Sequence, residues 1–551
     1  MGYRVSFLAE SVQDLQGDGA STGLTGQKLS RLRMLRDLLR REEVDVLEVL
    51  VEPSVITSPA SVQELAESLL APDLMGKGKL EILPSHFVPE IWGDGRERLI
   101  FCHQVNTLAR DRRLRDRWAK AASPLFWGTS FQPASSQQIA LRPALALDRV
   151  SFDRVLCISH CVKRGMEEIF AQDDSAGPAS VDYLPHIIDL DYLKPAEQEE
   201  KAALRRRYGL PESGRIALHL SRLTPSSKAD LAPLVERFCK ECREGEHLVI
   251  AGSSNSLGYV QTLKALVPPQ KLSQVHIRGE VPPAERRDFI AACDVFTFPA
   301  DFLMEGQGVA VYEALACGLP VVATHLTGAS EPIIDGVNGY KIPTWILPGF
   351  DRAEAMAEIS TFAVDGILQA QCVWFDWSVF MSSLWSLMRD TSLLHQFSEQ
   401  ASKSMASYGK EAHFKRFFNL VDQSFTAARQ EGAAREERRS RLKKTGPPVR
   451  MWDVFHFSGT QTLSANSLLE ITDEGLTGLR SGQGILIYSD LLPFSNKDLQ
   501  RAILSQLTDS PKRLDQLQVL APASELGLGD LHLQIGLLLR QGWLKIGVCS
   551  D

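Results

Sequence analysis

Two pairs of charged residues could together bind a phosphorylated ligand and support chemistry on it. Glu305 and Glu313 are separated by seven residues, and a glycine-rich loop, Gly306-Gln307-Gly308, follows the first of them. Such a loop can bring backbone N–H groups against a phosphate or a sugar when a helix begins behind it. Arg222 and Lys228 stand six residues apart earlier in the chain. Arginine offers a fork to two phosphate oxygens and lysine a point charge, so these cations could neutralise a diphosphate.

Short apolar strands and one helix are expected to position these residues. Val295–Phe298 is a β-branched and aromatic run, which predicts a buried strand before the glutamate loop. Val309–Ala316 predicts a short helix that ends near Gly318, and Val321–Ala323 predicts the next strand. Another apolar run, residues 216–220, leads into the loop that carries the two cations. The pattern of strand, loop, helix and strand indicates an α/β protein with parallel sheets.

The stretch from 292 to 342 resembles the signature of retaining GT-B glycosyltransferases of family 4. The matching positions are the two glutamates and the small or turn-forming residues around them: Glu305, Gly308, Glu313, Ala314, Ala316, Gly318, Pro320 and Val321. Gln307 stands where that family usually has an aromatic residue. Residues 215–228 are similar to the family's Gly-Arg-Leu-x3-Lys element, with Ser221 in place of the glycine.

This resemblance implies a GT-B fold, in which two Rossmann-like domains face a cleft. It also implies transfer of a sugar from a nucleotide-sugar to an acceptor hydroxyl with retention at the anomeric carbon. The nucleotide-sugar is then a co-substrate, and no metal or other cofactor is expected. The acceptor could be a glycan, a lipid-linked sugar, a natural product or a protein, and the sequence identifies neither the acceptor nor the donor sugar.

The family's roles can be carried over to the matching positions. Glu305 is expected beside the donor sugar and Glu313 at the ribose hydroxyls of the nucleotide. The backbone of Gly306 through Gly308, with Val309 behind it, is expected to meet sugar hydroxyls or phosphate. Arg222 and Lys228 are expected to stabilise the departing diphosphate, whose charge develops in the transition state.

Three further residues are candidates because of their position in the predicted fold. His103 follows a predicted strand at 99–102, and it is either a residue near the donor sugar or a capping or core histidine. Gly23 lies in a glycine-rich stretch after the first predicted strand, which either faces the donor phosphates or is a flexible loop. Arg278 ends another predicted strand and is placed near the nucleotide base.

The chain is long enough for several domains. We expect an acceptor-side domain at 1–195, a nucleotide-sugar domain at 205–400, crossover helices at 401–434 and a charged linker at 435–448. Residues 449–551 are expected to form a small α+β accessory domain. Its predicted helices near 497–507, 512–519 and 530–541, followed by a strand, resemble a winged-helix module.

The charge of this last unit bears on its partner. Residues 451–551 contain seven Lys and Arg against eleven Asp and Glu, and the whole chain has a net charge of −8. DNA binding depends on neutralising phosphates, so we expect a protein partner or self-association through 449–551, and no nucleic acid.

No apolar run approaches the length of a transmembrane segment or a signal peptide, and nine scattered cysteines suggest a reducing compartment. The expected location is the cytoplasm, with peripheral binding at the inner membrane as a variant of it.

Two other classes of function remain open at this point. One keeps the fold and makes the protein a nucleotide-sugar epimerase or a phosphorylase. The other is a non-catalytic nucleotide-sugar sensor that signals through its C-terminal domain. The unusual Gln307 and Ser221, with an apparent insertion at 347–376, keep the sensor in consideration, whereas the retained Arg222 and Glu305 favour an enzyme.

Overall fold

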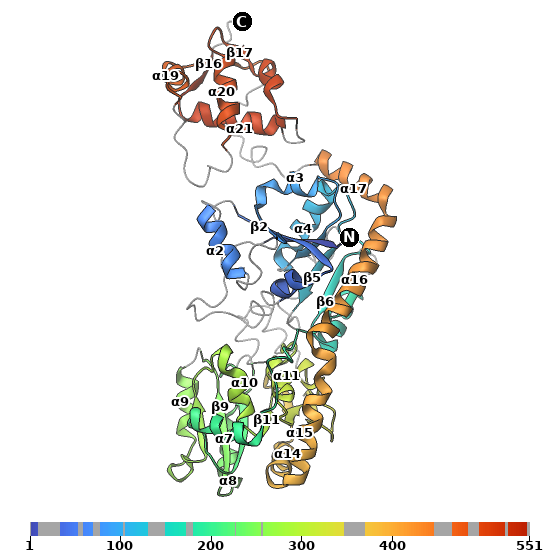
Figure 1. Cartoon of the computed structure of the whole chain (residues 1–551), viewed down its shortest axis with the longest axis vertical. Coiled ribbons are helices and arrows are strands. Elements are labelled where there is room, and N and C mark those ends of the chain that lie inside the picture. Colours follow the sequence, from blue (N-terminus) through green and yellow to red (C-terminus); the bar gives the residue numbers. More distant parts are fainter. Residues whose placement is uncertain are drawn as a thin grey trace.

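The structure is a computed structural model of the chain, and it is drawn in Figure 1. It describes residues 2–8, 34–52, 59–69, 78–102, 105–129, 149–171, 180–225, 228–254, 257–346, 368, 370–445, 465–482, 495–523 and 527–547. His103 and Gly23 lie outside these ranges, so both remain predictions.

The first domain is built on a seven-stranded parallel sheet with the order β3-β2-β1-β4-β5-β6-β7. Its strands are β1 (Tyr3–Leu8), β2 (Val44–Val51), β3 (Leu80–Pro84), β4 (Leu99–Cys102), β5 (Leu125–Thr129), β6 (Arg154–Cys157) and β7 (Ser180–Tyr183). Its helices include α2 (Pro59–Leu69), α3 (Val88–Trp92), α4 (Val105–Trp118) and α6 (His160–Ala171). The strand order reverses between β1 and β4, and such a switch point places ligands at the carboxyl ends of the strands.

The second domain has a six-stranded parallel sheet with the order β10-β9-β8-β11-β12-β13. Its strands are β8 (Arg215–Leu220), β9 (Glu246–Ala251), β10 (Val275–Arg278), β11 (Val295–Phe298), β12 (Val321–Thr324) and β13 (Gly339–Ile342). Its helices include α7 (Gln198–Arg207), α8 (Ala232–Glu241), α9 (Leu257–Ala265), α10 (Arg286–Ala291) and α11 (Val309–Ala316). The central strands β11 and β12 are buried along their whole length, as apolar strands covered on both faces are. The predicted strand, helix and strand around the glutamate pair are therefore confirmed.

Helices at the end of the second domain return to the first one (Figure 1). They are α14 (Trp377–Arg389), α15 (Thr391–Lys403), α16 (Lys410–Gln430) and α17 (Gly432–Thr445). Phe414, Phe417 and Phe425 on α16 are buried in the same core as Val5 and Phe7 of β1. This core joins residues some 400 positions apart, so α16 fixes the first domain to the end of the second.

Two stretches expected to lie outside the regular domains have structure of their own. The expected linker at 435–448 is helical as far as Thr445, because α17 continues the chain and packs on α4. The chain just before the expected insertion at 347–376 pairs with its described end, since β14 (Thr344–Ile346) and β15 (Val373–Phe375) form an antiparallel sheet.

The C-terminal unit has its own small core and a three-stranded antiparallel sheet of order β17-β16-β18. Its elements are β16 (Leu468–Ile471), α19 (Asp473–Ser481), α20 (Lys497–Gln506), β17 (Lys512–Arg513), α21 (Gly527–Arg540) and β18 (Leu544–Ile546). The expected helix at 512–519 is instead the short strand β17 followed by a 3₁₀ helix, Leu514–Leu520. Trp543 packs directly over Gly478 of α19, where a Cβ would lie 2.2 Å from the indole.

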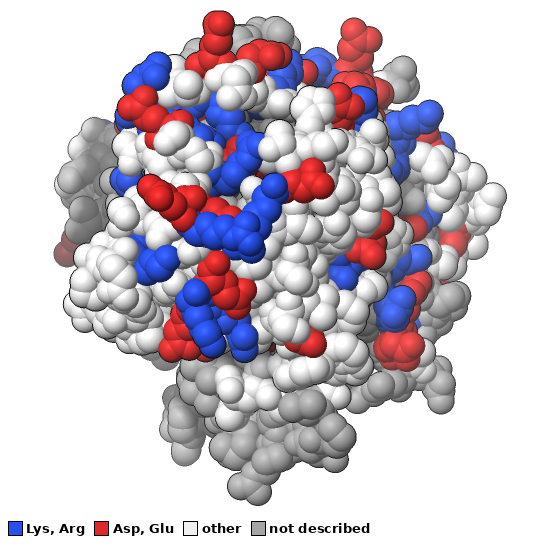
Figure 2. Space-filling model, turned by 90° about the horizontal axis from the view of Figure 1, so that it is seen from below, with Lys and Arg blue, Asp and Glu red and all other residues white. Residues whose placement is uncertain are grey.

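The described surface carries mixed charge, and the described helices fall short of the requirements of a membrane span. Figure 2 views it from the end where the second domain lies, and acidic and basic side chains are interspersed on that face. None of the described helices combines the length and apolar composition that crossing a lipid bilayer requires.

Candidate functional site

The neighbouring strands β8 and β11 bring a predicted cation and a predicted carboxylate into contact. Lys228 lies on the loop after β8, and Glu305 lies on the loop after β11. The Lys228 ammonium donates to Oε2 of Glu305 in an ion pair. The Glu305 side chain is 9% exposed and that of Lys228 is 22% exposed. Because burial strengthens this attraction, the pair is a defined charged centre at the carboxyl edge of the sheet.

The second oxygen of Glu305 holds the glycine loop in shape. Oε1 accepts a hydrogen bond from the backbone N–H of Gly308 at 3.0 Å. Gly308 precedes α11 with φ 67° and ψ 53°, a left-handed conformation that favours glycine. A Cβ at this position would lie 2.4 Å from the Cβ of Ala329, so both conformation and space require glycine.

The other predicted glutamate is also buried and has a cationic neighbour. Glu313 lies on α11 and is 4% exposed. Arg286, at the start of α10, donates to its two oxygens at 3.3 and 3.4 Å. The sequence pattern did not identify Arg286, because only the packing of α10 against α11 brings it to Glu313.

Residues of the first domain contact this same region. Glu331, just after β12, accepts hydrogen bonds from the backbone N–H groups of His160 and Cys161 at 3.0 and 2.8 Å. These groups begin α6 of the first domain, and a carboxylate is favoured at a helix N-terminus. A Cβ at Gly328 would lie 2.0 Å from the carbonyl oxygen of Gly306 and 2.7 Å from Oγ of Ser159. The glutamate loop, the loop after β12 and the end of β6 therefore meet at one point.

Gln307 links the glutamate loop to the segment that leaves the first domain. Its side chain is 1% exposed, and its Oε1 accepts a hydrogen bond from the backbone N–H of His186 at 2.9 Å. Its Nε2 is buried and has no hydrogen-bond partner among the described residues. The backbone of Gly306 and the first helical residue, Val309, complete the predicted loop at this place.

Among the described residues, neither of the two remaining predicted arginines contacts the Glu305–Lys228 pair. Arg222 is exposed on the loop after β8, and within the described part of the chain its side chain makes no hydrogen bond or ion pair. Its guanidinium is thus accessible to an anion. Arg278 ends β10 and donates to the carbonyl oxygen of Gly209 at 2.6 Å, so its side chain is held against the start of the second domain.

A buried histidine accounts for the departure at Ser221. His219 on β8 is fully buried, with Nδ1 3.0 Å from the carbonyl oxygen of Thr297 and Nε2 2.8 Å from Oγ of Ser221. A carbonyl can only accept, so Nδ1 carries the proton and Nε2 accepts from the serine. Burial lowers the pKa of His219 to about 4, so the imidazole is neutral at pH 7. The serine therefore provides a hydrogen bond that a glycine could not.

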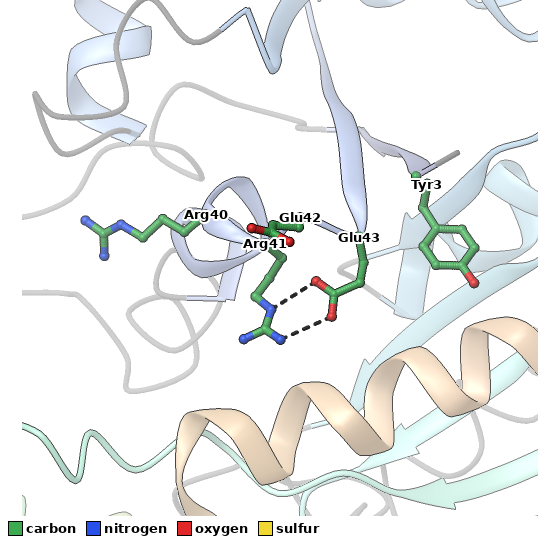
Figure 3. Close-up of a pocket in the computed structure, with 6 residues that line it drawn as sticks. Tyr3, Arg40, Arg41, Glu42 and Glu43 are labelled. Carbon is green, nitrogen blue, oxygen red and sulfur yellow. Dashed lines mark hydrogen bonds and ion pairs between the residues drawn. The ribbon is translucent and has the colours of Figure 1, made fainter.

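A hollow in the described surface lies at the other edge of the first domain's sheet. It has a volume of 760 Å³ and is lined by Gly2, Tyr3 and residues 40–43 (Figure 3). In this view Arg41 and Glu43 form a two-bond ion pair, with distances of 3.1 and 3.3 Å. These residues lie at the amino ends of β1 and β2, the edge opposite to the one where parallel sheets bind ligands. We therefore assign this hollow no part in the chemistry.

Comparisons with known proteins match the part of the chain that holds the charged centre. A family model described as glycosyl transferases group 1 matches residues 214–361, the range that holds both pairs of charged residues. A GDP-mannose-dependent monoacylated alpha-(1-6)-phosphatidylinositol monomannoside mannosyltransferase of Corynebacterium glutamicum is 27% identical over 252 residues, 42% of this chain and 64% of that protein. A D-inositol 3-phosphate glycosyltransferase of Xylanimonas cellulosilytica is 33% identical over 166 residues, 28% of this chain and 37% of that protein. The chain thus spans between 37% and 64% of the length of these relatives.

Solved structures share the arrangement of the two domains. A glycosyltransferase from Rickettsia africae superposes with a TM-score of 0.53 at 15% identity and covers 77% of this chain and 98% of that one. The Anabaena protein HepE, in complex with UDP and glucose, gives 0.51 at 15% identity and covers 76% of this chain and 100% of that one. At such identities the likeness establishes the fold alone. The predicted GT-B architecture of two Rossmann-like domains is confirmed.

Proposed function

We propose that this protein is a glycosyltransferase that moves a sugar from a nucleotide-sugar to an acceptor hydroxyl. The observation that carries the proposal is the Lys228–Glu305 ion pair. It lies at the carboxyl ends of adjacent strands, inside the range that matches the glycosyl transferases group 1 model. The curated relatives use GDP-mannose or D-inositol 3-phosphate by name, so GDP-mannose is the first donor to test.

Each charged group has a role in this reaction. When the bond between the sugar and the diphosphate breaks, negative charge develops on the departing phosphate. Lys228 and the accessible Arg222 supply cations that stabilise this charge. Glu305 accepts hydrogen bonds from donor-sugar hydroxyls, and Glu313 accepts them from the ribose. Gly308 allows the left-handed turn that holds its N–H against Glu305 and so fixes the shape of the loop.

We propose further that the reaction proceeds with retention and without a metal ion. Both oxygens of Glu305 are already engaged, by Lys228 and by the Gly308 N–H, so this carboxylate is poorly suited to act as a free general base. The leaving phosphate would then accept the acceptor's proton on the same face of the sugar. The two cations take the place that a divalent ion has in other diphosphate sites.

The remaining proposals, a cytoplasmic location and a protein partner for the C-terminal unit, rest on sequence composition.

A donor panel tests the proposal directly. The purified protein is incubated with UDP-, GDP-, ADP- and TDP-sugars, GDP-mannose included, and release of nucleoside diphosphate is recorded with and without candidate acceptors. We expect release from one donor, with a loss of about a hundredfold in Lys228→Met and Glu305→Gln, a magnitude typical when one electrostatic transition-state contact is removed. Lys240→Met and Glu244→Gln remove exposed charges at the opposite edge of the sheet and are matched controls.

Product analysis separates the alternatives. A new glycoside with the donor's anomeric configuration, formed equally well in excess EDTA, supports the proposal. An isomerised nucleotide-sugar or a sugar phosphate would identify an epimerase or a phosphorylase instead. Binding of a nucleotide-sugar without turnover in any acceptor mixture would favour the sensor.

A further inference from the structure

The side chain of Gln307 has an orientation that its surroundings fix. Its carboxamide faces the backbone N–H of His186 at 2.9 Å. A backbone N–H can only donate, so the atom that faces it must be the carboxamide oxygen. The NH₂ group of Gln307 is consequently turned away from His186 and presented as a donor on the other side.

That donor is buried and unused. Gln307 is 1% exposed, and none of the described residues accepts a hydrogen bond from its Nε2. Buried polar groups in proteins are almost always hydrogen-bonded, so an orphaned donor requires an explanation. A ligand that brings a hydrogen-bond acceptor to Nε2 would remove the energetic penalty of the unpaired donor.

A second unpartnered polar group lies in the adjoining loop. Oγ1 of Thr327 is buried, with the residue 4% exposed, and it also lacks a partner within the described ranges. Its loop touches the glutamate loop, since a Cβ at Gly308 would lie 2.4 Å from the Cβ of Ala329. Two adjoining loops at the carboxyl ends of β11 and β12 thus each carry a buried polar group that the protein leaves unsatisfied.

We propose that the Gln307 carboxamide determines which sugar the site accepts, by donating from Nε2 to a hydroxyl oxygen of the nucleotide-sugar's hexose. The inference rests on the proposed function and goes beyond it, because it assigns specificity to a side chain that replaces an aromatic residue. A neutral amide suits a neutral hydroxyl, whereas the charge of the diphosphate is matched by Arg222 and Lys228. A site built to hydrogen-bond a substrate hydroxyl discriminates strongly against an analogue that lacks it.

Two variants distinguish the role of the carboxamide oxygen of Gln307 from the role of its NH₂ group. Gln307→Glu keeps an oxygen that can accept from His186 and removes the NH₂ donor. Gln307→Met has a similar length and removes both. We expect both variants to bind the nucleotide-sugar about tenfold more weakly, which is what loss of one well-placed hydrogen bond gives. Affinity for the matching nucleoside diphosphate alone should stay within a factor of two to three, since no sugar is present. Calorimetry on the full-length protein measures both ligands.

A set of deoxy donors, each lacking one hexose hydroxyl, tests the proposal in the wild-type protein as well. One deoxy donor should bind about tenfold more weakly than the parent, and that donor alone should bind the wild type and Gln307→Met equally well. The wild-type measurement tests the proposal even if a variant fails to fold. If the wild type binds every deoxy donor with the same affinity, the proposal is overturned.

The other outcomes are equally distinct. Normal binding by Gln307→Glu with loss in Gln307→Met would show that only the bond to His186 matters, and would overturn the proposal. An equal loss for the nucleotide-sugar and the free diphosphate would move the contact to phosphate and overturn it too. If the wild type binds no nucleotide-sugar at all, the proposed function itself fails, which is a different result from a variant without effect.

Discussion

Gly308 shows how a single position controls the site at the scale of one residue. Its φ of 67° favours glycine, and a Cβ added here would lie only 2.4 Å from the Cβ of Ala329. The position therefore has no room for a side chain. We expect Gly308→Ala to reduce donor-dependent turnover at least tenfold, because the loop must shift and the bond from Gly308 N–H to Glu305 is lost. The left-handed conformation alone costs a residue with a Cβ about 1–2 kcal/mol. Turnover and thermal unfolding measure the two effects.

The chain offers a matched control for this substitution. Gly336 also has a positive φ, 72°, but no atom lies within 4 Å of the place where its Cβ would be. Gly336→Ala should therefore show the conformational cost without the loss of turnover. Equal turnover in Gly308→Ala and Gly336→Ala would contradict the role given to Gly308.

Sequence reasoning at this scale found the residues that belong to a continuous motif. Glu305, Gly308 and Glu313 could be predicted because one loop and one short helix carry them all. Arg286 and Glu331 could not, since each reaches the site only through the packing of separate elements. The bond between Gln307 and His186 was equally hidden, because 121 residues separate its partners.

At the scale of elements, strands and helices were easier to predict than the joints between them. The buried run of β11 and the glycine stop of α11 are local signals that burial reinforces. The 3₁₀ helix at Leu514–Leu520 replaced an expected α-helix because Lys512 and Arg513 pair with β16 instead. Strand pairing depends on a distant partner, which no local pattern reveals.

A buried histidine on helix α16 predicts how the stability of the protein depends on pH. His413 of this helix is buried, and the Nδ1 atom lies 2.8 Å from the carbonyl oxygen of Pro185. Pro185 follows β7, the last strand of the first domain. Burial lowers the pKa of His413 to about 4, with a smaller effect of His186 and Arg416 in the same direction. The unfolded chain binds this proton below about pH 6.5 and the folded protein does not. Stability therefore falls as pH drops from about 6.5 to 4, by about 3 kcal/mol for this residue alone.

His413→Asn isolates this contribution. Asparagine can donate to the same carbonyl and does not titrate, so the melting temperature of the variant should fall less between pH 7.5 and 4.5 than that of the wild type. His219 adds a slope of the same sign to both proteins and cancels in the comparison. His395→Asn, at a histidine that is 77% exposed, is the control and should follow the wild-type profile. Parallel profiles for His413→Asn and the wild type would show that the folded protein binds this proton as readily as the unfolded chain does, which would contradict a lowered pKa of His413.

At the scale of the whole molecule, three described links hold the two domains in register near the site. Helix α16 packs on the first domain, Gln307 bonds to His186, and Glu331 caps α6. The last two lie next to the loop that carries Glu305, so the position of the domains and the shape of the glutamate loop are coupled. Of these links, the cap by Glu331 is the one that can be removed without touching the core or the charged centre.

We therefore expect Glu331→Ala to weaken the contact between the two domains and to favour a more open arrangement. Loss of a capping side chain costs about 1 kcal/mol, which shifts an equilibrium between closed and open domains roughly fivefold toward open. Small-angle scattering should then report a larger radius of gyration, and the KM for the donor should rise by a similar factor with less change in kcat. Glu244→Ala, which removes an exposed glutamate far from α6, should change neither quantity. If Glu331→Ala keeps the wild-type radius and KM, the cap does not bear on domain closure, and α16 alone sets the distance between the domains.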